Sequence, residues 1–462
     1  MQHRGRHRRK RRGRALRATL AGTALALTAA ATLISTSQAA GGDSPGGLTR
    51  VTAATETAKL RLHEDLTDRR TLDRLTRAMG GGVDVHGVLA SADRTMRDRN
   101  ACDTAETAAL PVKPTAMRAY CWAHDDATAG DWVPRSVTTS GDAQDSGRWG
   151  ADRVILSGWT HGGGGSVQRA GDRGLARIAF IDADDPARLA YRWVLLVTPR
   201  SDGKDFTAVR TRLSGMVWYE DKLFVTDRGS LRVFDLHHIL KANVDSPAIG
   251  RVHGGYAAHG YQYVLPSVGS YRLTGGSCSR ADDHGVPCFW ALSLDRTSVP
   301  ASLVAAERFR PGSTDSPARV WRYPFSTVPG RLGLLSADGL RDVRASEAYR
   351  TDAADVQGVL SYRHGRAARA AWYVDGAPAV DGRHGTLWRQ NTSGATAATC
   401  SADESRACWG RHTASLSYWP ETGELWTLTE GATGGRAGPV PGPVNGRVLY
   451  AVPLDSVDDA LE

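Results

Sequence analysis

The stretch SGMVWYEDKLFVTDRGSLRVFDL, residues 214–236, decides the fold of this chain. It holds three short apolar runs, at 216–219, 223–225 and 231–234, separated by polar turns at 220–222 and 227–229. Runs rich in Val, Phe, Tyr and Trp that are bounded by Asp and Gly are typical of antiparallel strands joined by hairpins. The apolar residues do not recur at helical spacing. The stretch therefore predicts a three-stranded meander, which must pack against similar units because one small sheet cannot bury both faces.

The same pattern recurs five times from Tyr120 to the C-terminus. We expect inner strands to begin at Ser136, Gly215, Trp290, Gly358 and Ala414. Second strands are expected at 154–156, 223–225, 303–305, 372–374 and 425–428, third strands at 178–181, 231–234, 320–323, 387–389 and 448–452, and fourth strands at 191–197 and 343–349. Four-stranded antiparallel units repeated around an axis are propeller blades. The sequence therefore predicts an all-β fold, a five-bladed β-propeller of four-stranded antiparallel blades.

The last repeat ends at its third strand because little sequence follows Leu454. We expect residues 117–122, just before the first inner strand, to supply the missing outer strand. Such closure would join the two ends of the domain and remove an exposed sheet edge.

The first 39 residues have the three parts of a secretory signal peptide. Nine Arg or Lys residues lie between Arg4 and Arg17, an Ala/Leu/Thr-rich run covers 18–34, and Ser37-Gln38-Ala39 forms a small-residue cleavage site. An uncleaved anchor is the alternative, although so short an Ala- and Thr-rich segment is a poor membrane span. We therefore expect three parts, a signal peptide at 1–39, a linker and helical segment at 40–101 and a β-propeller at 102–462, in a secreted protein with no membrane span after cleavage.

The helical segment is predicted from apolar spacing after the linker. Leu62, Leu66, Leu72, Leu75 and Met79 suit one helix face, with a break near 67–70 and Thr71 as a candidate N-cap. A second short helix is expected at 88–96. The propeller thus carries a small N-terminal helical segment.

Formal charge excludes one class of partner. The chain has 58 basic and 49 acidic residues, and removal of the nine basic residues of the signal peptide leaves 49 of each. A neutral mature protein has no basic surplus for nucleic acid, so we expect no nucleic-acid partner.

The six cysteines form three close pairs in sequence and suit an oxidising compartment. Clustered Cys/His spacing of a zinc site is absent from the sequence, so no metal is expected. Other connectivities remain open, but neighbour pairing is the simplest: Cys102 with Cys121, Cys278 with Cys288, and Cys400 with Cys408.

The strings LRVFDL (231–236), VLSYRHGR (359–366) and LSYWPETGELWTLTE (416–430) resemble those of exported β-propeller-like proteins from bacteria with high-GC genomes. The resemblance covers about Cys102 to the C-terminus and implies the β-propeller superfamily, but no activity is established for that group. A His-Ala-Gly-Gly stretch often precedes the second inner strand there, and this chain has Arg212-Leu213-Ser214-Gly215 at the matching place.

Loops that lead into the inner strands and those between second and third strands meet on one side of a propeller, which we call the loop-rich face. Here they include the Gly-rich stretch 157–174 and the insertion 252–276. Loops on a rigid scaffold commonly carry binding residues, and aromatic rings offer flat contact area to sugars or peptides. Packing of the same rings onto the propeller is the alternative. The candidate ligand-binding residues are Trp159, His161, Arg212, Tyr256, His259, Tyr261 and Gln357.

An enzyme is the alternative function. Five-bladed propellers include glycosidases with two or three carboxylates at the mouth of the channel, one acting as acid and one as base. The candidate catalytic residues here are Asp355, Asp131 and His412, although Arg212 at the second inner strand and His412 at the fifth stand where acids would be needed.

The sequence contains no G-x-S-x-G elbow, because its one match to that pattern, Gly42–Gly46, lies in the linker, and it contains no H-E-x-x-H motif. We therefore interpret it as a secreted, monomeric, cofactor-free binding β-propeller that uses the loop-rich face, with an extracellular glycan or cell-wall component as the expected partner. The alternative is an extracellular glycan-cleaving enzyme.

Overall fold

The stretch at 214–236 folds into the predicted meander. It forms strands β12 (Met216–Tyr219), β13 (Lys222–Asp227) and β14 (Ser230–Asp235). Pairing of Tyr219 with Lys222 and of Asp227 with Ser230 leaves two-residue turns. Glu220 and Arg228, the first residues of these turns, have positive φ angles of 51° and 52°, as short hairpin loops require.

The computed structural model describes residues 44–162, 171–276, 278, 285–308, 317–365, 370–377, 383–401, 405–431 and 446–461. The predicted signal peptide and most of the Gly-rich loop after His161 lie outside these residues. The described residues belong almost entirely to one unit, Pro45–Glu462. Among them, no helix is both long and apolar enough to cross a membrane.

Every predicted inner, second and third strand is present. The remaining strands of the repeats are β7 (Trp132–Thr139), β8 (Val154–His161), β9 (Ala176–Asp182), β10 (Ala190–Pro199), β18 (Tyr263–Leu273), β19 (Ala291–Asp295), β20 (Ser302–Ala306), β21 (Ala318–Pro324), β23 (Glu347–Thr351), β24 (Val356–Tyr362), β25 (Ala371–Gly376), β26 (Thr386–Asn391), β27 (Gly394–Thr396), β28 (Thr413–Trp419), β29 (Glu424–Thr429) and β30 (Val448–Pro453). In nearly all of these strands, successive side chains point to opposite faces of the sheet. Both faces are buried because neighbouring sheets cover them.

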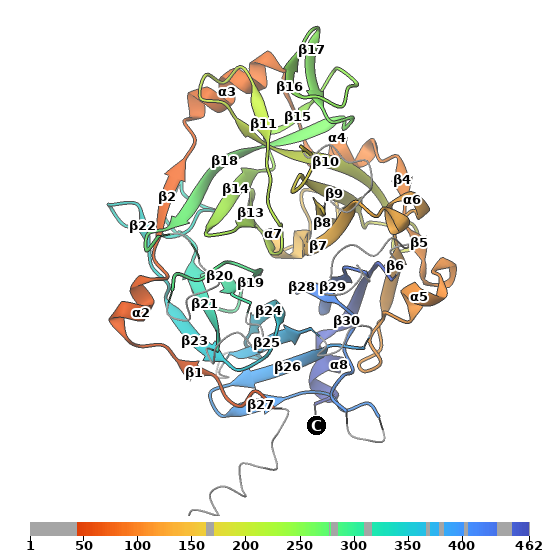
Figure 1. Ribbon diagram of the computed structural model, residues 1–462, viewed down its shortest axis with the longest axis vertical. Coiled ribbons are helices and arrows are strands. Elements are labelled where there is room, and N and C mark those ends of the chain that lie inside the picture. Colours follow the sequence, from red (N-terminus) through yellow and green to blue (C-terminus); the bar gives the residue numbers. More distant parts are fainter. Residues whose placement is uncertain are drawn as a thin grey trace, which may run out of the picture. The chain divides into compact units, whose positions relative to one another are not determined.

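The predicted closure is confirmed. Strand β6 (Arg118–Cys121) pairs antiparallel with β30, so that Tyr120 lies opposite Leu449 and Cys121 opposite Val448. Figure 1 shows β6 beside the blue C-terminal strand. A further short strand, β5 (Arg97–Asp98), continues this sheet beyond β6.

The inner strands form a closed cycle of neighbours. Strand β7 packs against β12 and β28, β12 packs against β19, and β24 packs against β19 and β28. In Figure 1 the other strands of each repeat extend outward from these inner strands. Antiparallel sheets arranged in this way around an axis define one architecture. The chain is a β-propeller.

The first two repeats differ from the expected separate blades. Strands β10 and β18 pair in parallel from Val194–Tyr263 to Val197–Pro266, which joins both repeats in one 14-stranded sheet. The first part of the long strand β18 pairs with β10 and its second part pairs with β14, which links the two repeats. Much of the predicted insertion at 252–276 is strand β18 itself, which corrects the expectation of a loop there. The segment before β18 forms β15 (Ile239–Lys241), β16 (Ile249–Val252) and β17 (Gly255–Ala258), and β11 (Phe206–Ala208) pairs with β10.

The N-terminal segment is only partly helical, which corrects the prediction. Leu62 and Leu66 belong to strand β2 (Leu62–Leu66), which pairs with β18. Buried Leu62 and Glu64 alternate with exposed neighbours, which is the period of a strand. Helix α3 (Arg69–Ala78) begins after Asp68 instead of Thr71. The predicted helix at 88–96 is helix α4 (Val85–Ala90) followed by strand β4 (Arg94–Thr95). The other short elements are β1 (Thr49–Arg50), α2 (Ala54–Ala58), β3 (Gly82–Val83), η1 (Arg99–Ala101), α5 (Thr104–Thr107), α6 (His124–Thr128), α7 (Ser140–Ala143), β22 (Asp342–Val343) and α8 (Leu454–Asp459).

The predicted neighbour pairing of the cysteines is confirmed. The Cα–Cα distances are 5.6 Å for Cys102–Cys121, 4.9 Å for Cys278–Cys288 and 5.7 Å for Cys400–Cys408. The first disulfide ties the N-terminal segment to closing strand β6. Three disulfides are compatible with an extracellular protein.

Candidate functional site

Three of the predicted residues gather around Trp290 on the loop-rich face. The guanidinium carbons of Arg212 and Arg308 lie 4.7 and 4.6 Å from the Trp290 ring centre, within cation–π range. The Trp290 indole N–H donates to Gln357 Oε1 at 3.2 Å. Asp355 completes the group through a two-point ion pair with Arg308, in which Arg308 Nη2 and Asp355 Oδ2 are 2.8 Å apart. Arg308 was not among the predicted residues, although it lies between second strand β20 and third strand β21, in a connection of the kind that reaches this face.

The three candidate catalytic residues have separate surroundings. Asp355 faces the Arg308 guanidinium, whereas a glycosidase acid needs a second carboxylate opposite it. The backbone carbonyl of Asp131 accepts from Gly162 N at 2.6 Å, and that of His412 accepts from Glu430 N at 2.9 Å. Within the described residues no hydrogen bond or ion pair joins Asp131, Asp355 and His412.

A second set of predicted residues lies in the core around Arg177. Trp159 is fully buried and His161 is nearly so. The Arg177 guanidinium carbon lies 3.6 Å from the Trp193 ring centre, and Arg177 Nη1 donates to the Tyr261 hydroxyl at 3.1 Å. Packing around Arg177 therefore accounts for the predicted aromatic residues Trp159 and Tyr261.

The remaining predicted aromatic residue also faces inward. Tyr256 is 7 % exposed, its hydroxyl donates to the Lys204 carbonyl at 2.9 Å, and its ring stacks on Phe206. His259 Nδ1 lies 3.1 Å from the Pro247 carbonyl oxygen. The insertion thus uses its rings to pack onto the propeller.

A cavity of about 220 Å³ lies at the opposite end of the channel, where the inner strands end. We call it the channel-end cavity. Its lining residues come from the ends of β19, β24 and β28 and from the connections that follow β7, β19 and β28: Asp142, Asp145, Leu294, Arg296, Thr297, Tyr362, Tyr418 and Pro420. The sequence predicts binding on the other side of the propeller, the loop-rich face. The sequence feature that could have indicated this site is a tyrosine at the end of two inner strands, Tyr362 in β24 and Tyr418 in β28.

The channel-end cavity combines two aromatic rings with one cation. The rings of Tyr362 and Tyr418 meet edge to face with centres 4.8 Å apart. Arg296 Nη2 donates to the Asp142 backbone carbonyl at 2.7 Å, and Arg296 also pairs with Asp145. Burial raises the pKa of the Tyr418 hydroxyl, which therefore stays neutral. The cavity thus offers donors, acceptors and apolar ring surface side by side.

Asp142, which lines this cavity, holds the ends of two inner strands together. Its Oδ2 accepts from the hydroxyls of Thr138 at 2.7 Å and Ser417 at 2.6 Å, which join the ends of β7 and β28. Burial raises its pKa to about 6 despite these hydrogen bonds. Its carboxyl is therefore committed to holding two inner strands together.

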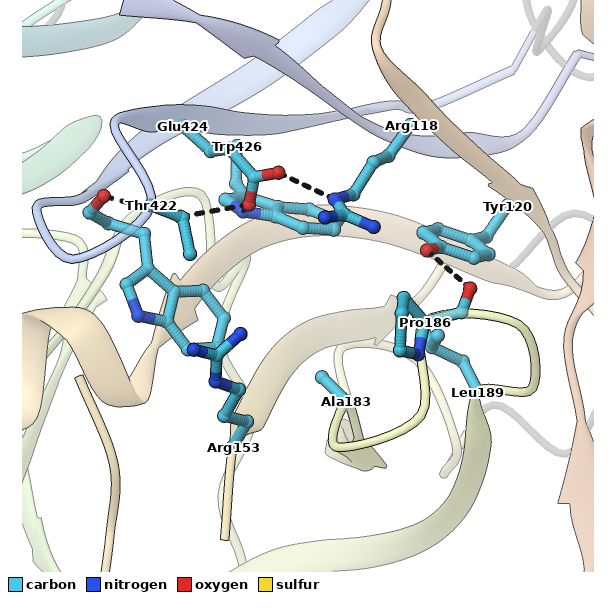
Figure 2. Close-up of a pocket in the computed structure, with 10 residues that line it drawn as sticks. Arg118, Tyr120, Arg153, Ala183, Pro186, Leu189, Thr422, Glu424 and Trp426 are labelled. Carbon is cyan, nitrogen blue, oxygen red and sulfur yellow. Dashed lines mark hydrogen bonds and ion pairs between the residues drawn. The ribbon is translucent and has the colours of Figure 1, made fainter.

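A smaller cavity, the outer cavity, lies between the fifth and first repeats (Figure 2). It has a volume of about 40 Å³ and is lined by Arg118, Tyr120, Arg153, Ala183, Pro186, Leu189, Trp419, Thr422, Glu424 and Trp426. Figure 2 shows Glu424 between Arg118 and Thr422, at 2.5 Å from Arg118 Nε and 2.9 Å from the Thr422 hydroxyl. Tyr120 and Trp426 are nearly parallel, with ring centres 6.3 Å apart.

Two groups of side chains among the described residues have metal-ligand character, and one of them, with Cys102 and Cys121, is occupied by a disulfide. Asp221, Asp235 and His237 offer ligand atoms within 4.8 Å of one another. Lys222 Nζ already pairs with Asp221 at 2.5 Å and with Asp235 at 3.1 Å. Its ammonium supplies the positive charge that these carboxylates need, so we assign no metal to the cluster.

No protein-family model and no curated protein matches this chain. Similar solved structures include the WD40 repeats of RRP9, with TM-score 0.25, 10 % identity and coverage of 70 % of this chain and 98 % of that one. U3-55K gives TM-score 0.25 and 10 % identity over 70 % and 99 % of the two chains. The β-propeller domain of the Trilobed protease from Pyrococcus furiosus gives TM-score 0.22 and 10 % identity over 67 % and 94 %. The architecture stated above rests on this chain's own strand pairing.

We expect the buried carboxyl of Asp375 in β25 to make the stability of the protein depend on pH. It is fully buried, its Oδ1 accepts from the Thr413 hydroxyl at 2.9 Å, and its Oδ2 has no hydrogen-bond partner among the described residues. Burial, with a smaller effect of the Glu430 charge, raises its pKa to about 7. In the unfolded chain the pKa is about 3.9. Its stabilising contribution is therefore complete below about pH 4 and is lost as the pH rises through about 7.

We expect Asp375→Asn to be more stable than the parent at pH 8, by a few kcal/mol, and to have a clearly smaller advantage at pH 5. The asparagine carbonyl keeps the acceptor for Thr413 and removes the buried charge. Urea unfolding at both pH values measures the difference, with exposed Asp145→Asn as the control. An equal effect of Asp375→Asn at both pH values would show that this carboxyl does not titrate in the range.

Proposed function

We propose that this chain is an exported, cofactor-free, glycan-binding protein that holds one sugar unit in the channel-end cavity. The observation that carries the proposal is the placement of the Tyr362–Tyr418 ring pair beside the Arg296–Asp145 ion pair. A sugar hydroxyl both donates and accepts hydrogen bonds, so it matches a guanidinium beside a carboxylate. The C–H faces of a sugar match aromatic rings, which offer large apolar area.

The charge balance supports a neutral ligand. Arg296 is already neutralised by Asp145, whose side chain is 94 % exposed. Such an exposed ion pair contributes little to stability and can exchange for hydrogen bonds to a ligand. The chain outside the predicted signal peptide has equal numbers of basic and acidic residues. An ionic ligand would need a surplus of one sign.

The cavity size supports a single sugar unit. Sites for drug-sized ligands have volumes of about 300–1,000 Å³. The channel-end cavity, at about 220 Å³, is smaller than these. It suits one ring, with the rest of a glycan outside.

We infer five blades from the five inner strands that neighbour one another in a cycle, with the first two blades joined at their outer strands. We infer secretion through residues 1–39, which the three disulfides support because they need an oxidising compartment. Recovery of a mature chain that begins after Ala39 in the culture medium would test the secretion.

The binding test compares one arginine on each face. N-acetylglucosamine, glucose and xylose are titrated calorimetrically into the parent, Arg296→Ala, Tyr418→Ala and Arg212→Ala. We expect at least one sugar to bind, Arg296→Ala and Tyr418→Ala to weaken it about tenfold or more, and Arg212→Ala to leave it unchanged. Absence of binding at millimolar sugar, or a loss caused only by Arg212→Ala, would refute the proposal.

A further inference from the structure

The two cavities share a wall. Tyr418 and Pro420 line the channel-end cavity, whereas Trp419 and Thr422 line the outer cavity. Tyr418 and Trp419 are successive residues at the end of β28, where side chains point to opposite faces, and Pro420 and Thr422 lie in the turn that follows. Residues 418–422 therefore contribute to the lining of both cavities.

Both cavities lie on the face where the inner strands end. Arg153 immediately precedes β8, and Pro186 and Leu189 lie in the connection from β9 to β10. In an antiparallel repeat these connections meet at the same end as the one that carries Arg296, which follows β19. Arg153 Nη2 pairs with Glu421 Oε1 at 2.7 Å across the shared turn, and both side chains are about one-third exposed. This exposed pair offers another donor and acceptor between the cavities.

The same chemistry occurs in both cavities. The channel-end cavity has Tyr362 and Tyr418 beside Arg296 and Asp145. The outer cavity has the parallel rings of Tyr120 and Trp426 beside the Arg118–Glu424 ion pair. A repeated set of rings and guanidinium–carboxylate pairs suits a ligand made of repeated units. With about 40 Å³, the outer cavity admits a substituent such as a hydroxymethyl or acetamido group but not a whole ring.

We propose that the two cavities are adjacent subsites for one neutral glycan chain, with one unit in the channel-end cavity and a substituent of a neighbouring unit in the outer cavity. This inference rests on the proposed function and adds its ligand class, a polymer instead of a free sugar. Joining a second contact to the first makes the second binding step intramolecular, so affinity rises with chain length until both cavities are filled.

The test measures affinity against chain length. N-acetylglucosamine, glucose and xylose and their β-1,4-linked oligomers of two to six units are titrated into the parent protein. We expect affinity to rise about 10- to 100-fold from one unit to two or three in at least one series, and then to level off. Two variants alter only the outer cavity: Arg153→Ala removes its exposed cation, and Ala183→Leu fills its space. Arg148→Ala is the matched control, because Arg148 lies in the same connection but pairs with Asp184 outside both cavities.

Each outcome decides between the two proposals. We expect both variants to reduce the gain with length to less than about threefold while affinity for the single sugar stays unchanged, and Arg148→Ala to keep the full gain. Single-sugar binding with no gain in the parent would refute the two subsites and leave the proposed function in place. A full gain in both variants would also refute the outer cavity as the second subsite. Failure of all three series to bind would overturn both proposals.

Discussion

Asp126→Ala is expected to lower the free energy of unfolding by more than about 5 kcal/mol, enough to prevent folding at 37 °C. The carboxylate of Asp126 is 4 % exposed. Its Oδ1 accepts from Arg177 at 3.1 Å, and its Oδ2 accepts from Arg94 at 3.1 Å. The Tyr191 hydroxyl at 2.6 Å and the Trp193 indole N–H at 3.2 Å complete its partners.

The cost is large because the partners remain buried when the carboxylate is removed. Arg177 would stay between aromatic rings without its counter-charge. Nearby Arg447, which donates to the Asp126 carbonyl at 2.8 Å, is fully buried, and burial lowers its pKa to about 9. Two cations would then face each other in a low-dielectric core, where an unpaired charge is most unfavourable.

Urea unfolding of Asp126→Ala and Asp125→Ala measures this effect with a matched control. The two aspartates are neighbours in α6, and Asp125 is exposed. We expect Asp125→Ala to change stability by less than about 0.5 kcal/mol. If Asp126→Ala were within about 1 kcal/mol of this control, the buried cluster would not be held together by the carboxylate.

The second large effect concerns ring closure. A chain that begins at residue 124 lacks β6 and is expected to remain unfolded, whereas a chain that begins at residue 44 is expected to fold as the full chain does. Loss of β6 exposes the edge of β30 and removes Trp122, which is fully buried against Trp159 and Tyr191. Loss of the same segment also removes β1 and β2 from two other sheets.

Circular dichroism and size-exclusion chromatography of the two chains check this prediction. The expected result for 124–462 is aggregation or a spectrum without β-structure, because an open sheet edge pairs with other chains. A monomeric, cooperatively unfolding 124–462 chain would show that the propeller does not need its N-terminal closing strand.

The repeats could be predicted because each strand carries its own signal. Apolar runs such as 223–225 and 231–234 alternate with polar turns, so strand positions follow from local sequence. The position of β6 followed from a global argument, since the last repeat lacked an outer strand. Strand β2 was not predicted, because its apolar residues, Leu62 and Leu66, suit one face of a helix as well as they suit a strand. Only the pairing with β18 makes this segment a strand.

The site could not be predicted because its residues are distant in sequence and ordinary in composition. Arg296, Tyr362 and Tyr418 each follow or end an apolar strand, where tyrosine and arginine are common. Only closure of the ring brings them together. By contrast, the aromatic residues of the insertion stood out in sequence, but Tyr256 and Tyr261 use their hydroxyls for internal hydrogen bonds. On the loop-rich face, sequence identified Arg212, Asp355 and Gln357 but not the tryptophan ring that joins them.

Hydrogen–deuterium exchange, with and without the tightest-binding oligosaccharide of the three series, tests most directly which face binds. If a glycan occupies the two cavities, exchange slows at 294–297, 362–363 and 418–424, which surround them, and stays unchanged at 210–213 and 355–357 on the loop-rich face. Protection confined to 210–213 and 355–357 would contradict binding in the two cavities.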